Sequence, residues 1–149
     1  MKVEPDLSSR PHKLTVERTL QLSPATVYRA FTEQIDRWFA APGTAIMRGE
    51  VDVPFFFETH FEGQRHPHYG RFLRLEPGKL LELTWITGKS GTDGAETVVT
   101  VELSPANGGT HVRLTHAGFL NEEARDGHEK AWPLVLAHLE EKMAGTTGE

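Results

Sequence analysis

Apolar and polar residues alternate near the start of the chain, over residues 13–22. Leu14, Val16 and Leu20 fall on one face of this segment, and threonine and glutamate residues fall on the other. Successive side chains of a strand point to opposite faces, so the pattern predicts a strand with one buried face. Arg18 shares the apolar face, where an unpaired charge is costly, so it must bind a carboxylate, carbonyl groups or a ligand anion.

Signals for two helices flank the middle of the chain. Ser23 and Pro24 predict the start of the first, because a capping hydroxyl precedes a proline at the first helical position. Residues 34–40 favour a second short turn, and Asn121 caps a long C-terminal helix. The apolar positions of that helix are Trp132, Val135, Leu136, Leu139 and Met143. Pro133 predicts a kink in this helix or a late start.

A run of short strands is predicted between these helices. The predicted strands span residues 44–51, 54–61, 69–75, 80–87, 96–103 and 110–116. Turn residues such as Glu62-Gly63 and Asn107-Gly108 separate them, and short loops favour antiparallel neighbours. The order of elements predicts an α+β fold, in which a curved antiparallel sheet of about six or seven strands wraps around the long helix.

Length and composition indicate one ordinary globular domain. The chain has 149 residues, of which 38% are hydrophobic and 25% charged, and this fits a single domain over residues 13–143. Residues 1–12 are expected to form a flexible tail and residues 144–149 a frayed end. The sequence has no segment with the length of a membrane span and no signal peptide pattern, so a cytoplasmic protein is expected.

Charge and cysteine content argue against several function classes. The formal net charge of -5 disfavours nucleic acid and anionic membranes as partners, because a duplex-binding surface needs a basic face. The chain has no cysteine, which excludes disulfides, thiol catalysis and thiolate metal sites. The motifs of serine hydrolases, phosphate loops, dinucleotide sites and zinc proteases are also missing from the sequence. We therefore predict no cofactor and no catalytic residue.

Several segments together resemble a known family. They are residues 18–20, 27–32, 68–72, 77–80 and 114–119, followed by His128 and Trp132. Segment 114–119, Leu-Thr-His-Ala-Gly-Phe, is the most specific of these. Over residues 14–143 the chain resembles the activator of the heat-shock protein 90 ATPase, in the bacterial single-domain form of its C-terminal domain. The resemblance implies the START-like, helix-grip fold of the Bet v allergens and polyketide cyclases.

This superfamily binds ligands, so we expect an internal hydrophobic cavity that holds a small apolar or aromatic molecule. The candidate pocket residues, assigned from alternation, are Arg18, Trp38, Phe57, His68, Tyr69, Leu73, Trp85, Val99, Val112, His116, Trp132 and Leu136. Two alternatives stay open. One is a co-chaperone of the stress response that contacts a heat-shock chaperone, and the other is a cyclase- or hydrolase-type enzyme using a pocket histidine. A monomer or a homodimer is expected.

The eight histidines of the chain raise the question of a metal site. His66 and His68 lie two residues apart, so they share one face of a strand. A third ligand such as Glu58 or His60 would be needed, but both alternate to the opposite face. No metal site is therefore predicted.

A tight turn at Glu62-Gly63 also predicts the register of the hairpin that contains these histidines. With this turn, His68 lies opposite Phe57 and His66 lies opposite Thr59. The two histidines then lie on the same side of the sheet as Phe57 and Thr59 of the neighbouring strand.

Two further polar residues fall on apolar faces. His116 is in phase with Val112, and it could exchange a proton with a ligand near neutral pH. The alternative, which we favour, is a buried histidine that hydrogen-bonds the backbone where the last strand leaves for the long helix. Arg18 could anchor an acidic ligand. The more ordinary interpretations are a buried ion pair, for which Glu58 or Glu82 could serve, or a side chain that extends to solvent at the end of the strand.

Overall fold

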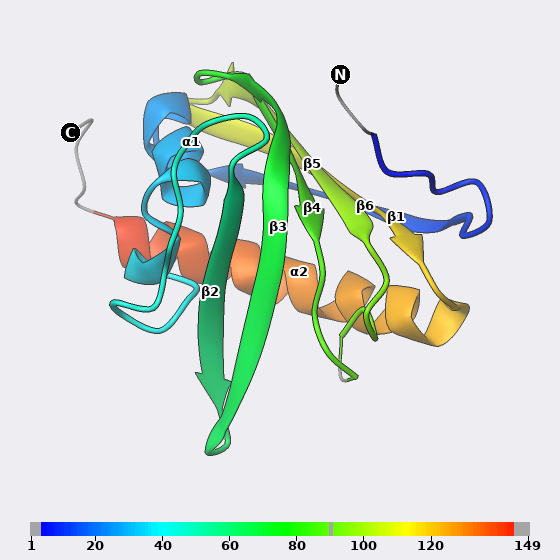
Figure 1. The fold of residues 1–149 in the computed structure, drawn as a ribbon. Coiled ribbons are helices and arrows are strands. Elements are labelled where there is room, and N and C mark those ends of the chain that lie inside the picture. The colour runs from blue at the N-terminus through cyan, green and yellow to red at the C-terminus, as the bar shows by residue number, and fades with distance from the viewer. Residues whose placement is uncertain (1–3, 90, 145–149) are drawn as a thin grey trace.

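Six strands form one antiparallel sheet in the computed structural model, which describes residues 4–89 and 91–144 (Figure 1). The elements are β1 (His12–Leu20), α1 (Pro24–Thr32), the short 3-10 helix η1 (Ile35–Arg37), β2 (Pro54–Phe61), β3 (Gln64–Glu76), β4 (Leu80–Trp85), β5 (Thr97–Ala106), β6 (Gly109–Phe119) and α2 (Glu122–Met143). The strand order is β1-β6-β5-β4-β3-β2. The predicted α+β helix-grip fold is therefore confirmed.

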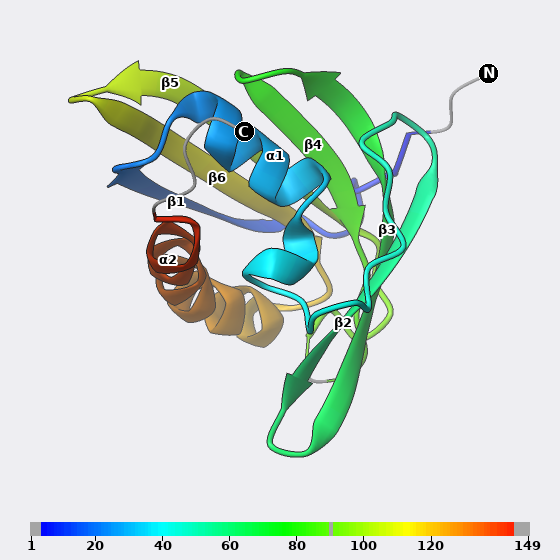
Figure 2. The same cartoon turned by 90° about the vertical axis from the view of Figure 1, so that its left-hand side faces the viewer.

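The helices cover the concave face of the curved sheet (Figure 2). The side chains of α2 that face the sheet are fully or almost fully buried, and they are Trp132, Leu136, Leu139 and Met143. They belong to one core cluster with inward-facing strand residues such as Val99 and Val112. The centre of the sheet–helix interface is thus filled by the protein's own side chains.

The β2–β3 hairpin has the register that the sequence predicts. Phe57 lies opposite His68, and Thr59 lies opposite His66. Glu62 and Gly63 form the turn with φ angles of 51° and 75°, and such left-handed turns match the twist of the two strands. The end of this hairpin projects beyond α2 (Figures 1 and 2), which leaves the inner side of the hairpin end open.

The predicted strand over residues 44–51 is wrong. This segment makes only isolated bridges, from Ile46 to Phe56 and from Val51 to Phe72. The chain bends at Gly49 and Glu50, so the two bridging residues cannot belong to one continuous ladder. The side chain of Ile46 is consequently 70% exposed.

Helix α2 runs from Glu122 to Met143 with Pro133 inside it, so the alternative of a late start is wrong. Proline lacks an N–H, which leaves the carbonyl of Glu129 without its usual helical partner. The side chain of Asn121 accepts from the N–H of Ala124 and caps the helix, as the sequence predicts.

The described part of the N-terminal segment is attached to the sheet. The guanidinium of Arg10 donates to the carbonyl oxygens of Gly118 and Glu96, both at 2.8 Å. Residues 1–3 of the expected tail and residues 145–149 of the expected frayed end lie outside the described residues.

Candidate ligand-binding site

An open groove of about 770 Å³ lies where the end of the β2–β3 hairpin, the loop after β4 and the middle of α2 meet. We call it the hairpin groove, and its lining residues are Phe39, Thr59, Phe61, Gln64, Arg65, His66, Pro67, His68, Trp85, Thr87, Gly88, Lys89, Gly91, His128, Ala131, Trp132 and Val135. A second hollow of about 590 Å³ adjoins it over the first turns of α2. The two share Lys89, Gly91, His128 and Ala131.

Aromatic rings form the apolar side of the hairpin groove. The ring centroid of Trp85 lies 5.4 Å from that of Trp132 and 5.8 Å from that of Phe39. Trp85 and Trp132 are nearly buried, at 5% and 3% exposure, so they are held by the core while one side contributes to the groove. Rings fixed in this way suit an apolar or aromatic ligand, because these two side chains lose no conformational freedom when a ligand binds.

His68, on β3 of the hairpin, lines the groove next to these aromatic rings. Its ring stacks on Phe57 at a centroid distance of 4.7 Å and meets Trp85 edge-on at 5.1 Å. Its Nδ1 lies 2.9 Å from the carbonyl oxygen of His66. Burial lowers the pKa of His68 to about 4, so the imidazole is neutral at pH 7.

His116 is completely buried at the centre of a hydrogen-bond chain. Trp132 Nε1 can only donate, so it donates to His116 Nδ1 at 3.0 Å. The neutral ring then carries its proton on Nε2 and donates to Thr97 Oγ1 at 2.7 Å, while Thr97 donates to the carbonyl of Trp85 at 2.5 Å. Burial holds the pKa of His116 well below its usual range. Both ring nitrogens therefore have partners within the fold.

His128 lies where the two hollows meet. Its Nδ1 lies 2.8 Å from the carbonyl oxygen of Ala124, one turn earlier in α2. Its ring packs against Phe119 and His116 at centroid distances of 4.8 and 5.0 Å. Burial lowers the pKa of His128 as well.

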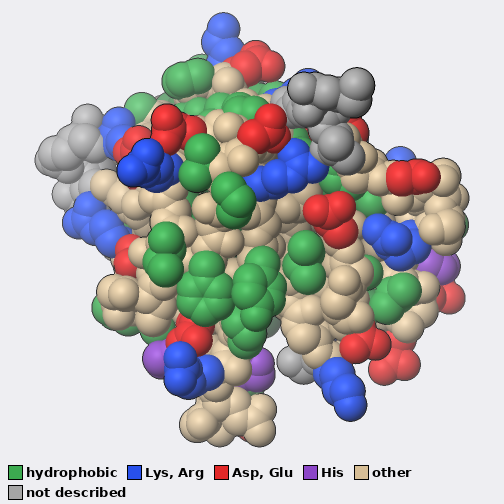
Figure 3. Space-filling model, in the orientation of Figure 1, with side chains coloured by type: hydrophobic (Ala, Val, Ile, Leu, Met, Phe, Trp, Pro, Cys, Tyr) green, Lys and Arg blue, Asp and Glu red, His purple; other side chains and the backbone are tan. Residues whose placement is uncertain are grey.

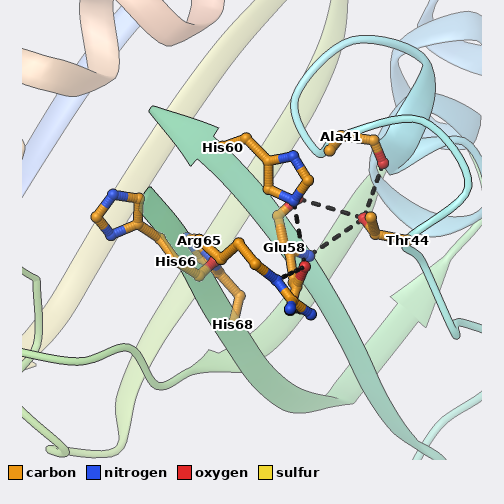
Figure 4. Close-up of polar contacts among 7 residues, drawn as sticks. All are labelled: Ala41, Thr44, Glu58, His60, Arg65, His66 and His68. Carbon is orange, nitrogen blue, oxygen red and sulfur yellow. Dashed lines mark hydrogen bonds and ion pairs between the residues drawn. The ribbon is translucent and has the colours of Figure 1, made fainter. Parts of the chain in front are cut away.

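The outer side of the hairpin is held by a polar cluster around Glu58 (Figure 4). Arg65 donates to both carboxylate oxygens of Glu58, at 3.0 and 2.8 Å, and His60 Nε2 lies 3.2 Å from one of them. The hydrogen bonds from Arg65, followed by that from His60, lower the pKa of Glu58. The backbone of Glu58 is tied to Thr44 and Ala41. This cluster fixes the two strands together next to the groove.

Metal binding finds no support in this geometry. Within residues 4–89 and 91–144, no three histidine, aspartate or glutamate side chains are placed to hold one ion. In Figure 4, the ring of His66 points away from Glu58 and His60. Both oxygens of Glu58 are already engaged by the Arg65 guanidinium.

The pocket candidates from the sequence divide into groups. His68, Trp85 and Trp132 line the hairpin groove. Buried side chains elsewhere in the fold are Trp38, Phe57, Leu73, Val99, Val112, His116 and Leu136. Tyr69 is 47% exposed and contacts Phe56 on the outer face of the sheet. Arg18 pairs with Glu140 of α2 at 3.2 Å, rather than with Glu58 or Glu82.

Sequence reasoning missed several groove residues, among them Phe39, Lys89 and Val135. A signal for some of them existed. His128, Ala131 and Val135 follow helical spacing along one side of α2, next to the buried stripe that begins at Trp132. Phe39 and Lys89 lie outside regular helices and strands, where periodicity gives no direction for a side chain.

The model of one protein family, Activator of Hsp90 ATPase homolog 1-like protein, matches residues 21–144. This chain belongs to that family. The match includes the hairpin, the loop after β4 and all of α2, so every element that borders the groove lies within the family's domain. No curated protein matches the sequence. In the described parts of the chain, no helix is long and apolar enough to cross a bilayer.

Solved structures with the same fold cover almost the whole chain. Protein MLL2253 from Mesorhizobium loti is 26% identical with a TM-score of 0.75, over 91% of this chain and 98% of that one. Protein CV1439 from Chromobacterium violaceum is 22% identical with a TM-score of 0.74, over 87% and 96%. The Aha1 dimer from Colwellia psychrerythraea is 20% identical with a TM-score of 0.64, over 93% and 98%.

Proposed function

We propose that this Aha1-like protein binds a small apolar or aromatic molecule in the hairpin groove. The observation that carries the proposal is the groove of about 770 Å³ with Trp85, Trp132 and Phe39 on its apolar side. This volume lies within the range of small-molecule sites in proteins, about 300–1,000 Å³. Lys89, Gln64 and His66 add polar groups to the lining, which would orient a bound molecule.

The proposed site differs from the cavity expected beneath the centre of the helix. Val99, Val112 and Leu136 have no exposed surface, so the central core has no accessible wall at these positions. The ligand is instead proposed to enter where the hairpin end projects beyond α2 (Figure 1). Transfer of its apolar surface from water contributes about 25 cal/mol per Å².

A direct test uses thermal unfolding with increasing concentrations of bicyclic aromatic compounds such as 2-naphthol. Binding to the folded state raises the melting temperature in a saturable way. Ala131→Phe places a ring in the groove and is expected to abolish the shift, because Ala131 is an exposed lining residue of α2. Lys130→Phe is the matched control, because the exposed Lys130 does not line the groove.

Two outcomes would contradict the proposal. One is a diverse aromatic panel that leaves the melting temperature unchanged. The other is a shift of equal size in Ala131→Phe and in the unmodified protein, because binding would then take place elsewhere.

The family match supports a second candidate, contact with a heat-shock chaperone that stimulates its ATPase. The matching family model is named for homologues of the Hsp90 ATPase activator. The test is the ATPase rate of a purified Hsp90-type chaperone with increasing amounts of this protein. An unchanged rate, together with no complex in size-exclusion chromatography, would exclude this candidate.

The histidine geometry gives less support to an enzyme. Thr97 and Trp132 engage both ring nitrogens of His116. His68, with a pKa of about 4, is a weak base at neutral pH, whereas a general base works best with a pKa near the working pH. We therefore assign binding rather than turnover to the groove.

A further inference from the structure

The two ring nitrogens of His68 have different roles. Nδ1 lies 2.9 Å from the carbonyl oxygen of His66, and a carbonyl oxygen only accepts hydrogen bonds. Nδ1 therefore carries the proton of the neutral ring. Nε2 is left with a lone pair and acts as a hydrogen-bond acceptor.

This acceptor is accessible from the hairpin groove. Nε2 of His68 has no hydrogen-bond partner among the described residues. In this part of the chain, the polar side-chain atoms that are both fully buried and without a partner all belong to Arg29. Nε2 of His68 is therefore not fully buried. The ring is held by Phe57 at 4.7 Å, Trp85 at 5.1 Å and Phe39 at 5.6 Å. It is therefore fixed in direction, and its open side belongs to the groove that His68 lines.

The charges around the groove do not favour a protonated His68. None of the described lining residues is an aspartate or glutamate, so no carboxylate in the lining would stabilise an imidazolium. The Arg65 guanidinium is bound to Glu58 on the other side of the hairpin. Lys89 is exposed, so water and salt screen its attraction for a ligand carboxylate.

We propose that His68 selects ligands with a neutral hydrogen-bond donor, namely a hydroxyl group on an aromatic or apolar ring system. This inference rests on the proposed function and names its ligand class. The hydroxyl donates to Nε2 while the ring system lies against Trp85 and Trp132. A ligand with a carboxylate at this position would place a second acceptor against the lone pair, which is unfavourable.

The test compares three ligands that share a naphthalene ring system by isothermal titration calorimetry: 2-naphthol, 2-methoxynaphthalene and 2-naphthoate. We expect 2-naphthol to bind about 3- to 10-fold more tightly than 2-methoxynaphthalene, because a ratio of this size corresponds to the net free energy of one hydrogen bond. In His68→Phe, which keeps a ring on Phe57 but removes the acceptor, this preference should disappear. His60→Phe, on the outer side of the same hairpin, should retain it.

The outcomes separate this inference from the proposed function. Binding of the naphthalene compounds without a preference for the hydroxyl, or with a preference that persists in His68→Phe, overturns the role of His68 alone. Tightest binding of 2-naphthoate also overturns it. If none of the three compounds binds, the proposed function fails and the role of His68 fails with it.

A second measurement needs no substitution, in case His68→Phe does not fold. In the ¹⁵N-labelled protein, the imidazole resonances should show the proton of His68 on Nδ1. Addition of 2-naphthol should shift the Nε2 resonance toward that of a hydrogen-bonded acceptor, whereas 2-methoxynaphthalene should not. A proton on Nε2, or equal shifts with both compounds, contradicts the inference.

Discussion

Three histidines at or next to the hairpin groove are shielded from water by the fold. His68, His116 and His128 each have a pKa lowered mainly by burial. His116 is enclosed by donors and acceptors of the fold, whereas His68 keeps one nitrogen toward the groove. The alternating pattern of the sequence placed His116 on an apolar face and His68 opposite Phe57, but alternation does not show which nitrogen has a partner. That difference depends on Trp132 and Thr97, which bind the two ring nitrogens of His116 and are distant from it in the sequence.

The neutral state of His68 predicts a pH dependence of stability. Its pKa falls from an ordinary 6.5 to about 4 in the folded protein. Above pH 6.5 neither state binds the proton, and the full stability is present. Between pH 6.5 and 4 only the unfolded chain binds it, so the free energy of unfolding falls by about 1.4 kcal/mol per pH unit from this group. Urea titrations of the unmodified protein and of His68→Phe measure this slope.

The expected result is a shallower slope in His68→Phe over this range, with a total difference of about 3 kcal/mol. Val99→Ala is the control, because it removes buried carbon without removing a titratable group. It should lower the free energy of unfolding by a similar amount at every pH. Equal slopes in His68→Phe and the unmodified protein would show that His68 is not held neutral by the fold.

At the scale of elements, the contact between β3 and β4 depends on a glycine in the family motif of residues 68–72. A Cβ at Gly70 would overlap the carbonyl oxygen of Thr84 and the ring of Phe55. Gly70→Ala should therefore lower the free energy of unfolding by about 1–3 kcal/mol, as overpacking does. Gly127→Ala is the matched control, because a Cβ there meets nothing within 4 Å. On helix α2 it should raise stability by about 0.4–1 kcal/mol. Chemical denaturation measures both, and equal effects would contradict this assignment.

The elements also show what local sequence can predict. Alternation and the Glu62-Gly63 turn were sufficient for the β2–β3 register, because a two-residue turn fixes both the pairing and the faces of a hairpin. The same alternation failed over residues 44–51, where a bend interrupts the pairing. Pro133 did not delay the helix, because the buried residues on both sides of it stabilise α2 against the sheet.

At the scale of the whole molecule, the fold could be predicted better than the site. Periodicity shows which side chains face the core, and most of the pocket candidates are buried for that reason. Periodicity does not show where the sheet extends beyond helix α2. The groove exists because the hairpin projects beyond α2, a matter of relative lengths and angles (Figure 2). Hydrophobic side chains also gather on the outer side of the sheet (Figure 3), where Tyr69 of β3 and Ile46 of the segment before β2 are exposed.

This arrangement leads to a prediction for the entire chain. Three of the segments that border the groove are distant from one another in the sequence: the hairpin end over residues 59–68, the loop residues 87–89 and 91, and α2 over residues 128–135. A ligand that contacts all three should slow amide hydrogen exchange in each of them, because binding makes local opening of these segments less favourable. Strand β1, at the other edge of the sheet, should change little. Hydrogen-exchange mass spectrometry with saturating 2-naphthol measures this pattern.

The Ala131→Phe variant provides the control for that experiment, since its groove is filled and the same compound should leave all three segments unchanged. The second hollow offers a contrasting pattern. A ligand bound there would slow exchange around residues 120–128 and leave the hairpin end unaffected, because no hairpin residue lines that hollow. Joint protection of the hairpin end and α2 is therefore the result that distinguishes the hairpin groove from its neighbour. Protection of α2 without the hairpin would assign the ligand to the second hollow.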